Sequence, residues 1–65
     1  MMPELFADHV TLTEQIAEAE REIKLRERVY PRMIRSRQMS EAMAERRLTL
    51  MRAIAETLRQ VHPLK

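Results

Sequence analysis

Residues 26–35 read Arg-Glu-Arg-Val-Tyr-Pro-Arg-Met-Ile-Arg, and the proline at position 31 separates two segments that each have a helical apolar pattern. Proline cannot donate a backbone hydrogen bond, and it disfavours helical geometry in the residue before it. The sequence therefore predicts that a first helix ends or kinks at Tyr30 and that the chain then turns back. The segment would form the tip of a helical hairpin.

The first helix has a defined start signal. In residues 11–14, the Thr11 hydroxyl can accept a hydrogen bond from the amide of Glu14 while the Glu14 carboxylate reaches back, which is a capping box. We expect this helix to span about residues 12–29. Its apolar seam recurs in alternating steps of four and three residues, with one charged position at Arg26, and consists of Leu12, Ile16, Ala19, Ile23, Arg26 and Tyr30. Acid–base pairs at helical spacing are Glu18 with Arg21, Glu20 with Lys24, and Glu22 with Arg26.

A second helix is expected from residue 41 to about residue 61, with Ser40 as its N-cap and Pro63 beyond its end. Residues 30–40 would form the connection. The apolar residues of this helix fall in two adjacent stripes. One stripe contains Met43, Leu50, Ile54 and Val61, and the other contains Ala44, Leu48, Met51, Ala55 and Leu58.

Two apolar stripes on one helix need two neighbours, and a second copy of the chain can supply the neighbour that the first helix does not. The sequence thus predicts an all-α fold, a two-helix antiparallel hairpin that dimerises into a four-helix arrangement. A lone hairpin and a continuous long-helix coiled coil are the alternatives. Residues expected in the core or the dimer interface are Ile16, Ile23, Leu48, Leu50, Met51, Ile54 and Leu58.

Composition supports a single helical domain spanning residues 1–65. A third of the residues are charged and glycine is absent, which is typical of long helices that pack against one another. There is no cysteine, and no apolar run approaches the roughly 18 residues of a spanning helix. We expect a soluble, cytoplasmic protein that makes no membrane contact.

No catalytic or metal-binding pattern is found. His9 and His62 lie far apart in the sequence without a second ligand at helical spacing, so solvated histidines are the simpler interpretation. Glu14, Glu18 and Glu22 form a ladder of carboxylates, but no Glu-x-x-His motif accompanies it, and a solvated helix face explains it. We expect no enzymatic activity and no cofactor.

Positive charge gathers around the expected tip, where Glu27 is the one acidic residue in the cluster. The cations are Lys24, Arg26, Arg28, Arg32, Arg35 and Arg37. Three interpretations remain open: a solubilising cluster that pairs with Glu41 and Glu45, a protein-binding surface anchored by Tyr30, and a nucleic-acid contact. Nucleic acid is disfavoured because net charge is only +2 and aromatic residues for base stacking are scarce.

Four blocks of sequence carry a resemblance to a known family. They are Arg21-Glu22-Ile23, Arg28-Val29-Tyr30-Pro31-Arg32, Ala44-Glu45-Arg46-Arg47 and Met51-Arg52-Ala53-Ile54. With their spacing, over roughly residues 19 to 58, they resemble small phage and prophage proteins with an R-E-I…R-V-Y-P-R…A-[DE]-R-R…M-x-A-I pattern. Arg37 departs from the pattern, because the family has a loop glycine there.

The resemblance extends to anti-quorum-sensing proteins of Pseudomonas phages, which are dimers of helical hairpins. It implies a protein that binds and inhibits a host protein: a LuxR-type quorum-sensing regulator, whose DNA binding it would block, and the pilus assembly ATPase. Charge complementarity favours an acidic face for the regulator and the basic tip for a more acidic partner. Candidate partner-binding residues are Glu14, Glu18, Glu22, Arg26, Arg28, Tyr30, Arg32 and Arg35. A nucleic-acid-binding accessory protein and a structural or assembly protein are the alternatives.

Overall fold

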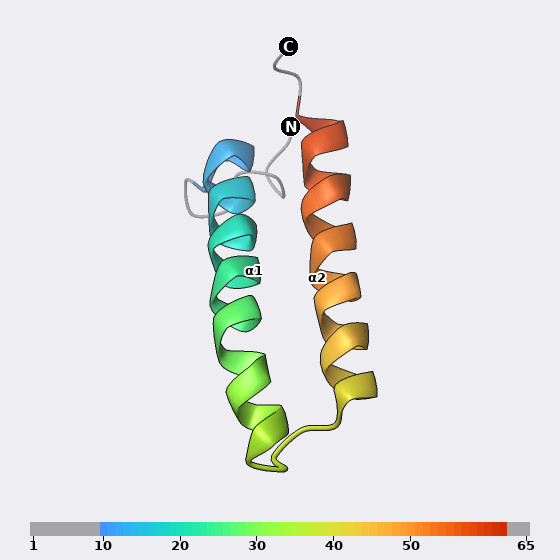
Figure 1. Ribbon diagram of the computed structural model, residues 1–65. Helices are drawn as coiled ribbons and strands as arrows, with labels where there is room; N and C mark the ends of the chain where they lie inside the picture. Colours follow the sequence, from blue (N-terminus) through green and yellow to red (C-terminus); the bar gives the residue numbers. More distant parts are fainter. Residues whose placement is uncertain (1–9, 63–65) are drawn as a thin grey trace.

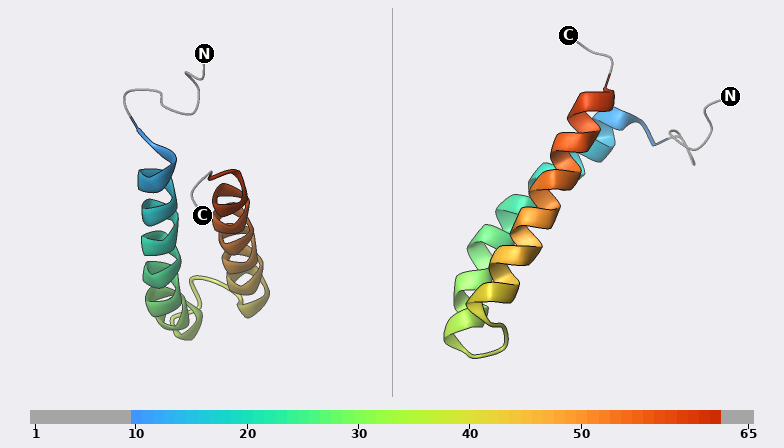
Figure 2. Two further views of the ribbon diagram at one scale, coloured as in Figure 1. Left: turned by 90° about the horizontal axis from the view of Figure 1, so that it is seen from above. Right: turned by 90° about the vertical axis from the view of Figure 1, so that its right-hand side faces the viewer.

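The computed structural model describes residues 10–62, which form two α-helices and a short connection without any strand. Helix α1 spans Leu12–Arg35 and α2 spans Glu41–Val61. The helices run antiparallel and pack against each other along their length (Figure 1, Figure 2). The molecule is a rod with extents of 46 × 21 × 17 Å. The predicted all-α fold and the hairpin are confirmed.

Both helices begin at the residues that the sequence marks as caps. The Thr11 hydroxyl accepts a hydrogen bond from the amide of Glu14, and Glu14 Oε1 accepts one from the amide of Thr11, each at 3.1 Å. Ser40 Oγ accepts from the amide of Met43 at 3.0 Å. The first-turn amides have no partner within a helix, so these side chains satisfy groups that would otherwise depend on water.

The end of α1 differs from the prediction. The helix continues through Pro31 to Arg35, so an end at residue 29 or 30 and a connection of residues 30–40 are wrong. Tyr30 is only 8% exposed and Met33 is half-buried, so the extra turn and a half continues the packing against α2. Pro31 itself is exposed, so its ring takes up no space in the contact between the helices.

The connection, residues 36–40, turns the chain in a tight loop. The amide of Gln38 donates to the carbonyl of Met33 at 2.9 Å, and the amide of Arg37 donates to the carbonyl of Ile34 at 3.0 Å. Arg37 has φ 65°, which is the left-handed region that glycine adopts most easily. Arginine carries a Cβ that crowds the backbone in this region, so Arg37 is held in a strained conformation.

The core of the single chain is small. Among residues 10–62, three of the five buried apolar residues are alanines, and the set consists of Leu12, Ala19, Tyr30, Ala44 and Ala55. The two predicted stripes of α2 separate clearly, since the stripe with Ala44 and Ala55 faces α1 and the other is exposed. Of the residues predicted for the core or dimer interface, those half-buried are Ile16, Ile23, Leu48, Met51 and Leu58. Leu50 and Ile54 are exposed.

Candidate protein-binding surfaces

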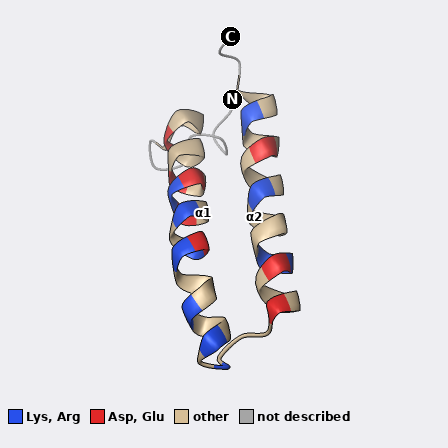
Figure 3. Cartoon of the chain, viewed as in Figure 1, with Lys and Arg blue, Asp and Glu red and all other residues tan. Residues whose placement is uncertain are grey.

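The continuous α1 helix aligns four cations on its outer surface. Lys24, Arg28, Arg32 and Arg35 follow one another in steps of four, four and three residues, so they share one helical face. All four are exposed, and none forms an ion pair or side-chain hydrogen bond within residues 10–62. Toward the connection, α1 shows basic bands without acidic ones (Figure 3). We call these four residues the basic stripe.

The carboxylates of Glu14, Glu18 and Glu22 follow one another in steps of four residues on a face of α1 that adjoins the basic stripe, and we call them the acidic ladder. Each already has a partner in its own chain. Glu14 takes part in the capping box, Glu18 Oε2 lies 2.7 Å from Arg21 Nη2, and Glu22 Oε2 lies 2.8 Å from Arg26 Nε. Two of the three predicted acid–base pairs are thus present, but Lys24 does not pair with Glu20.

The acidic ladder borders an open groove between α1 and α2. The groove has a volume of about 500 Å³, and its apolar lining includes Met51, Ile54 and Leu58. Beside it, the exposed stripe of α2 forms what we call the apolar ridge: Met43, Leu50, Ile54 and Val61, which are 46–54% exposed. We call this side of the hairpin, with the ridge and the ladder, the open face.

The opposite side of the hairpin is closed by polar contacts between the helices. Arg59 Nη2 lies 2.6 Å from Glu20 Oε2, and Arg52 Nη2 lies 2.8 Å from Glu27 Oε2. Residues two apart on a helix point about 200° apart, so Glu20 faces away from Glu18 and Glu22. The hairpin therefore has one edge closed by ion pairs and one apolar edge without a covering element among the described residues.

Tyr30 and Arg26, both predicted to bind a partner, lie toward the helix interface instead of on the outer surface. Tyr30 is buried, and Arg26 is half-buried beside it. The hydrogen bond to Glu22 raises the pKa of Arg26 above its ordinary value, and the Tyr30 hydroxyl adds to the effect. A partner-binding role of these two residues stays a prediction, but the hairpin leaves little of the tyrosine ring for a partner to contact.

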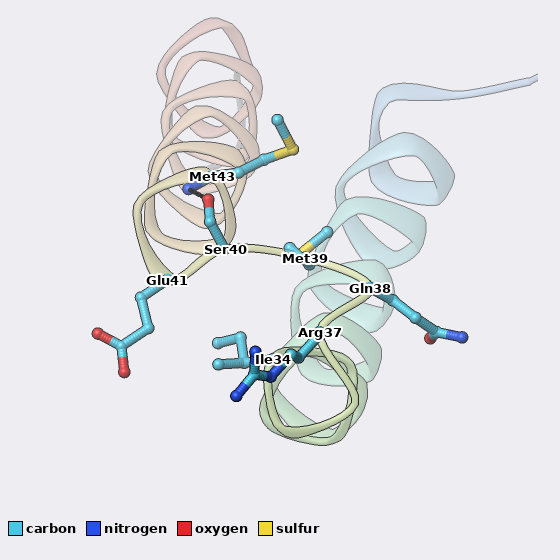
Figure 4. Close-up of a pocket in the computed structure, with 7 residues that line it drawn as sticks. All are labelled: Ile34, Arg37, Gln38, Met39, Ser40, Glu41 and Met43. Carbon is cyan, nitrogen blue, oxygen red and sulfur yellow. Dashed lines mark hydrogen bonds between the residues drawn. The ribbon is translucent and has the colours of Figure 1, made fainter.

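The connection contains a shallow hollow with Ile34, Met39 and Met43 among its lining residues (Figure 4). In the close-up, Gln38 points away from Ile34 and Arg37, and the Ser40 hydroxyl caps α2. The polar groups here serve the turn and the helix start. We assign no binding role to this hollow.

Within residues 10–62, no three metal-ligating side chains come together. Thr13 Oγ1 lies 2.9 Å from Nε2 of His62, while His9 lies outside the described residues. Neither of the two described helices is apolar enough over sufficient length to cross a membrane. The candidate binding surfaces are the exposed ones described above, of which the basic stripe and the open face are the two extended ones.

Sequence reasoning brought Arg28, Arg32 and Arg35 into one cluster but missed that they share a helical face with Lys24. The spacing was readable, but the helix end expected at Tyr30 concealed it. The basic cluster does not pair with Glu41 or Glu45 within the described residues. The contacts of Arg52 and Arg59 with α1 were also missed, because a single sequence does not show which edges of two helices meet.

No family model, curated protein or solved structure matches this chain. The resemblance to phage and prophage proteins therefore stays a prediction from the four sequence blocks described above.

Proposed function

We propose that this chain is a non-enzymatic phage or prophage protein that acts as a homodimer and inhibits a host protein by binding to it. The observation that supports binding is the basic stripe, whose four cations have no partner within residues 10–62. Three of the four are arginines, and the planar guanidinium group pairs with a carboxylate through two parallel hydrogen bonds. The bound surface of the host protein would accordingly be acidic.

The resemblance supplies two candidate targets: a LuxR-type quorum-sensing regulator, which would be prevented from binding DNA, and the pilus assembly ATPase. The sequence alone favoured the acidic ladder as the surface for the regulator, because DNA-binding surfaces are basic. Glu18 and Glu22 each pair with an arginine of their own chain, which reduces the negative potential that they offer to a partner. We therefore assign docking of either target to the basic stripe, which on the regulator would contact an acidic patch beside the basic DNA-binding surface and block DNA by its bulk.

The experiment uses each purified target with the full chain and measures complex formation, together with DNA binding by the regulator. Reversing the stripe with Arg28→Glu, Arg32→Glu and Arg35→Glu should abolish the complex and restore DNA binding. The control, Glu14→Gln with Glu18→Gln, removes two charges from the ladder, and glutamine at position 14 can still form a capping box. Loss of binding only in this control would show that docking uses the ladder. Failure of the native chain to bind either target would contradict these target assignments.

Direct nucleic-acid binding is the second candidate function, because a line of cations along a helix can also follow a phosphate backbone. The two functions differ in salt dependence. Phosphate contacts release condensed counterions, so the logarithm of a true nucleic-acid affinity falls linearly with the logarithm of the salt concentration. Titration of labelled duplex DNA at several salt concentrations tests this. A salt slope that shrinks in the stripe variant would favour nucleic acid.

A further inference from the structure

We propose that the open face binds a second copy of this chain about a two-fold axis at the height of Glu27 and Arg52. The inference deepens the homodimer of the proposed function by assigning its interface. Within residues 10–62, three of the five buried apolar residues are alanines, so the hairpin of this 65-residue chain has little core of its own. The apolar ridge is left exposed by the other described residues, and a second copy covers it with the same kind of surface.

The spacing of the ridge fits an antiparallel copy of itself. Together with Arg47 and Thr57, its residues follow α2 in steps of four, three, four, three and four, a series that reads the same from either end. Its midpoint lies at Arg52. An antiparallel second α2 centred there places Leu50 against Ile54 of the second copy and Met43 against Val61 of the second copy. Every apolar member of the ridge then meets an apolar residue.

Helix α1 supports the same axis independently. The ion pair of Glu27 with Arg52 places these two residues at one height in the hairpin. Leu25 lies two residues before Glu27 and Val29 lies two residues after it. Both line a hollow together with Glu22, and Glu22 also borders the groove that contains Ile54. They therefore lie on the open face. The same axis that centres the ridge brings Leu25 of one copy to the height of Val29 of the other.

Charge complementarity agrees with this register. Arg47 is exposed and has no ion pair within residues 10–62. The proposed pairing sets it opposite Thr57 of the second copy. The two ion pairs between the helices put Thr57 at the height of Glu22, so Arg47 of one copy arrives beside Glu22 of the other. The two-fold symmetry produces the contact between Arg47 and Glu22 twice. In this arrangement the acidic ladder faces the partner copy.

The interface leaves the basic stripe on the outer surface of the dimer. Its test is therefore separate from that of host-protein binding: the dimer can form whether or not either target binds. Sedimentation equilibrium of the full chain measures the dissociation constant of the dimer. Arg47→Glu should raise it by about tenfold or more, because a steering contact becomes a repulsion.

The matched control is Arg46→Glu, which makes the same charge change one residue away, outside the ridge. It should leave the dissociation constant within about twofold, and adding Glu22→Arg to Arg47→Glu should restore the dimer. A native chain that stays monomeric overturns the proposal. Equal responses of the Arg46 and Arg47 variants, or no rescue by Glu22→Arg, overturn it as well.

Cysteine cross-linking tests the direction of the pairing in a chain without native cysteine. A mixture of Met43→Cys and Val61→Cys chains should form a mixed disulfide. Val61→Cys alone should not, since the proposed register sets the two copies of residue 61 about 27 Å apart along the helix axis, at 1.5 Å per residue. Cross-linking of Val61→Cys to itself would indicate parallel helices and overturn the antiparallel interface.

Discussion

Glu27 and Arg52 join the two helices across 25 residues of sequence, with 2.8 Å between Glu27 Oε2 and Arg52 Nη2. Glu20 and Arg59 repeat the contact seven residues further along each helix, at 2.6 Å. Because the helices are antiparallel, the two pairs fix the register of the hairpin along one edge. They also leave the other edge as the place where an additional helix can pack.

The Glu27–Arg52 pair should contribute little to stability despite this role in register. About half of each side chain is exposed, and exposed ion pairs contribute about 0.2–1 kcal/mol. A double-mutant cycle with Glu27→Ala and Arg52→Ala, measured by urea unfolding at one chain concentration, should give a coupling energy in that range. The coupling should decrease at high salt. A coupling above about 2 kcal/mol would show that solvent screens the pair less than its exposure indicates.

The Thr11 cap should contribute more to the free energy of unfolding than an exposed threonine within a helix does. Thr11→Ala removes the acceptor of the Glu14 amide and should lower the free energy of unfolding by about 1 kcal/mol, whereas Thr11→Ser should retain most of it. Thr49→Ala, in the exposed middle of α2, is the control and should not destabilise the protein, because alanine is the better helix former. Equal losses at positions 11 and 49 would argue against capping at Thr11.

Such local signals explain which parts of the fold were predictable. Thr11 and Ser40 act through contacts within three residues, so their side chains predict the helix starts correctly. Pro31 is different, because its local rule is outweighed by packing. Tyr30 is buried and Met33 is half-buried where α1 packs against α2. The free energy from this packing depends on the other helix, so a local sequence pattern does not reveal it. The same limitation hid the basic stripe, which depends on the helix continuing past the proline.

Tyr30 should behave as a core residue. Its 8% exposure predicts that Tyr30→Ala lowers the free energy of unfolding by several kcal/mol, about the 3–5 kcal/mol seen for large aromatic side chains. Tyr30→Phe keeps the ring and should retain most of the stability. Thermal unfolding followed by circular dichroism measures both. If Tyr30→Ala instead kept its melting temperature and lost only partner binding, the anchor role predicted from the sequence would be correct.

Arg37 offers a stabilising substitution. A left-handed conformation costs a residue with a Cβ about 1–2 kcal/mol, and glycine adopts it without that cost. Glycine also gives the unfolded chain more freedom, which offsets part of the gain. Arg37→Gly should therefore raise the free energy of unfolding by up to about 1 kcal/mol in chemical denaturation. Ser36→Gly, at the neighbouring position with φ −87°, should give no gain, so a gain there and none at position 37 would contradict strain at Arg37.

Pro31 provides the last prediction, because it lies inside α1 between Arg28 and Arg32 of the basic stripe. A proline in a helix interior costs about 3 kcal/mol relative to alanine, through the lost hydrogen bond and a clash with the preceding turn. Since Pro31 is exposed, Pro31→Ala removes no buried contact and should raise the free energy of unfolding by about 1–3 kcal/mol. The spacing of the stripe is unchanged, so binding of an acidic partner should persist. Lower stability of Pro31→Ala in urea unfolding would mean that the proline fixes the direction of the α1 axis. Loss of partner binding alone would mean that the proline sets the relative direction of Arg28 and Arg32.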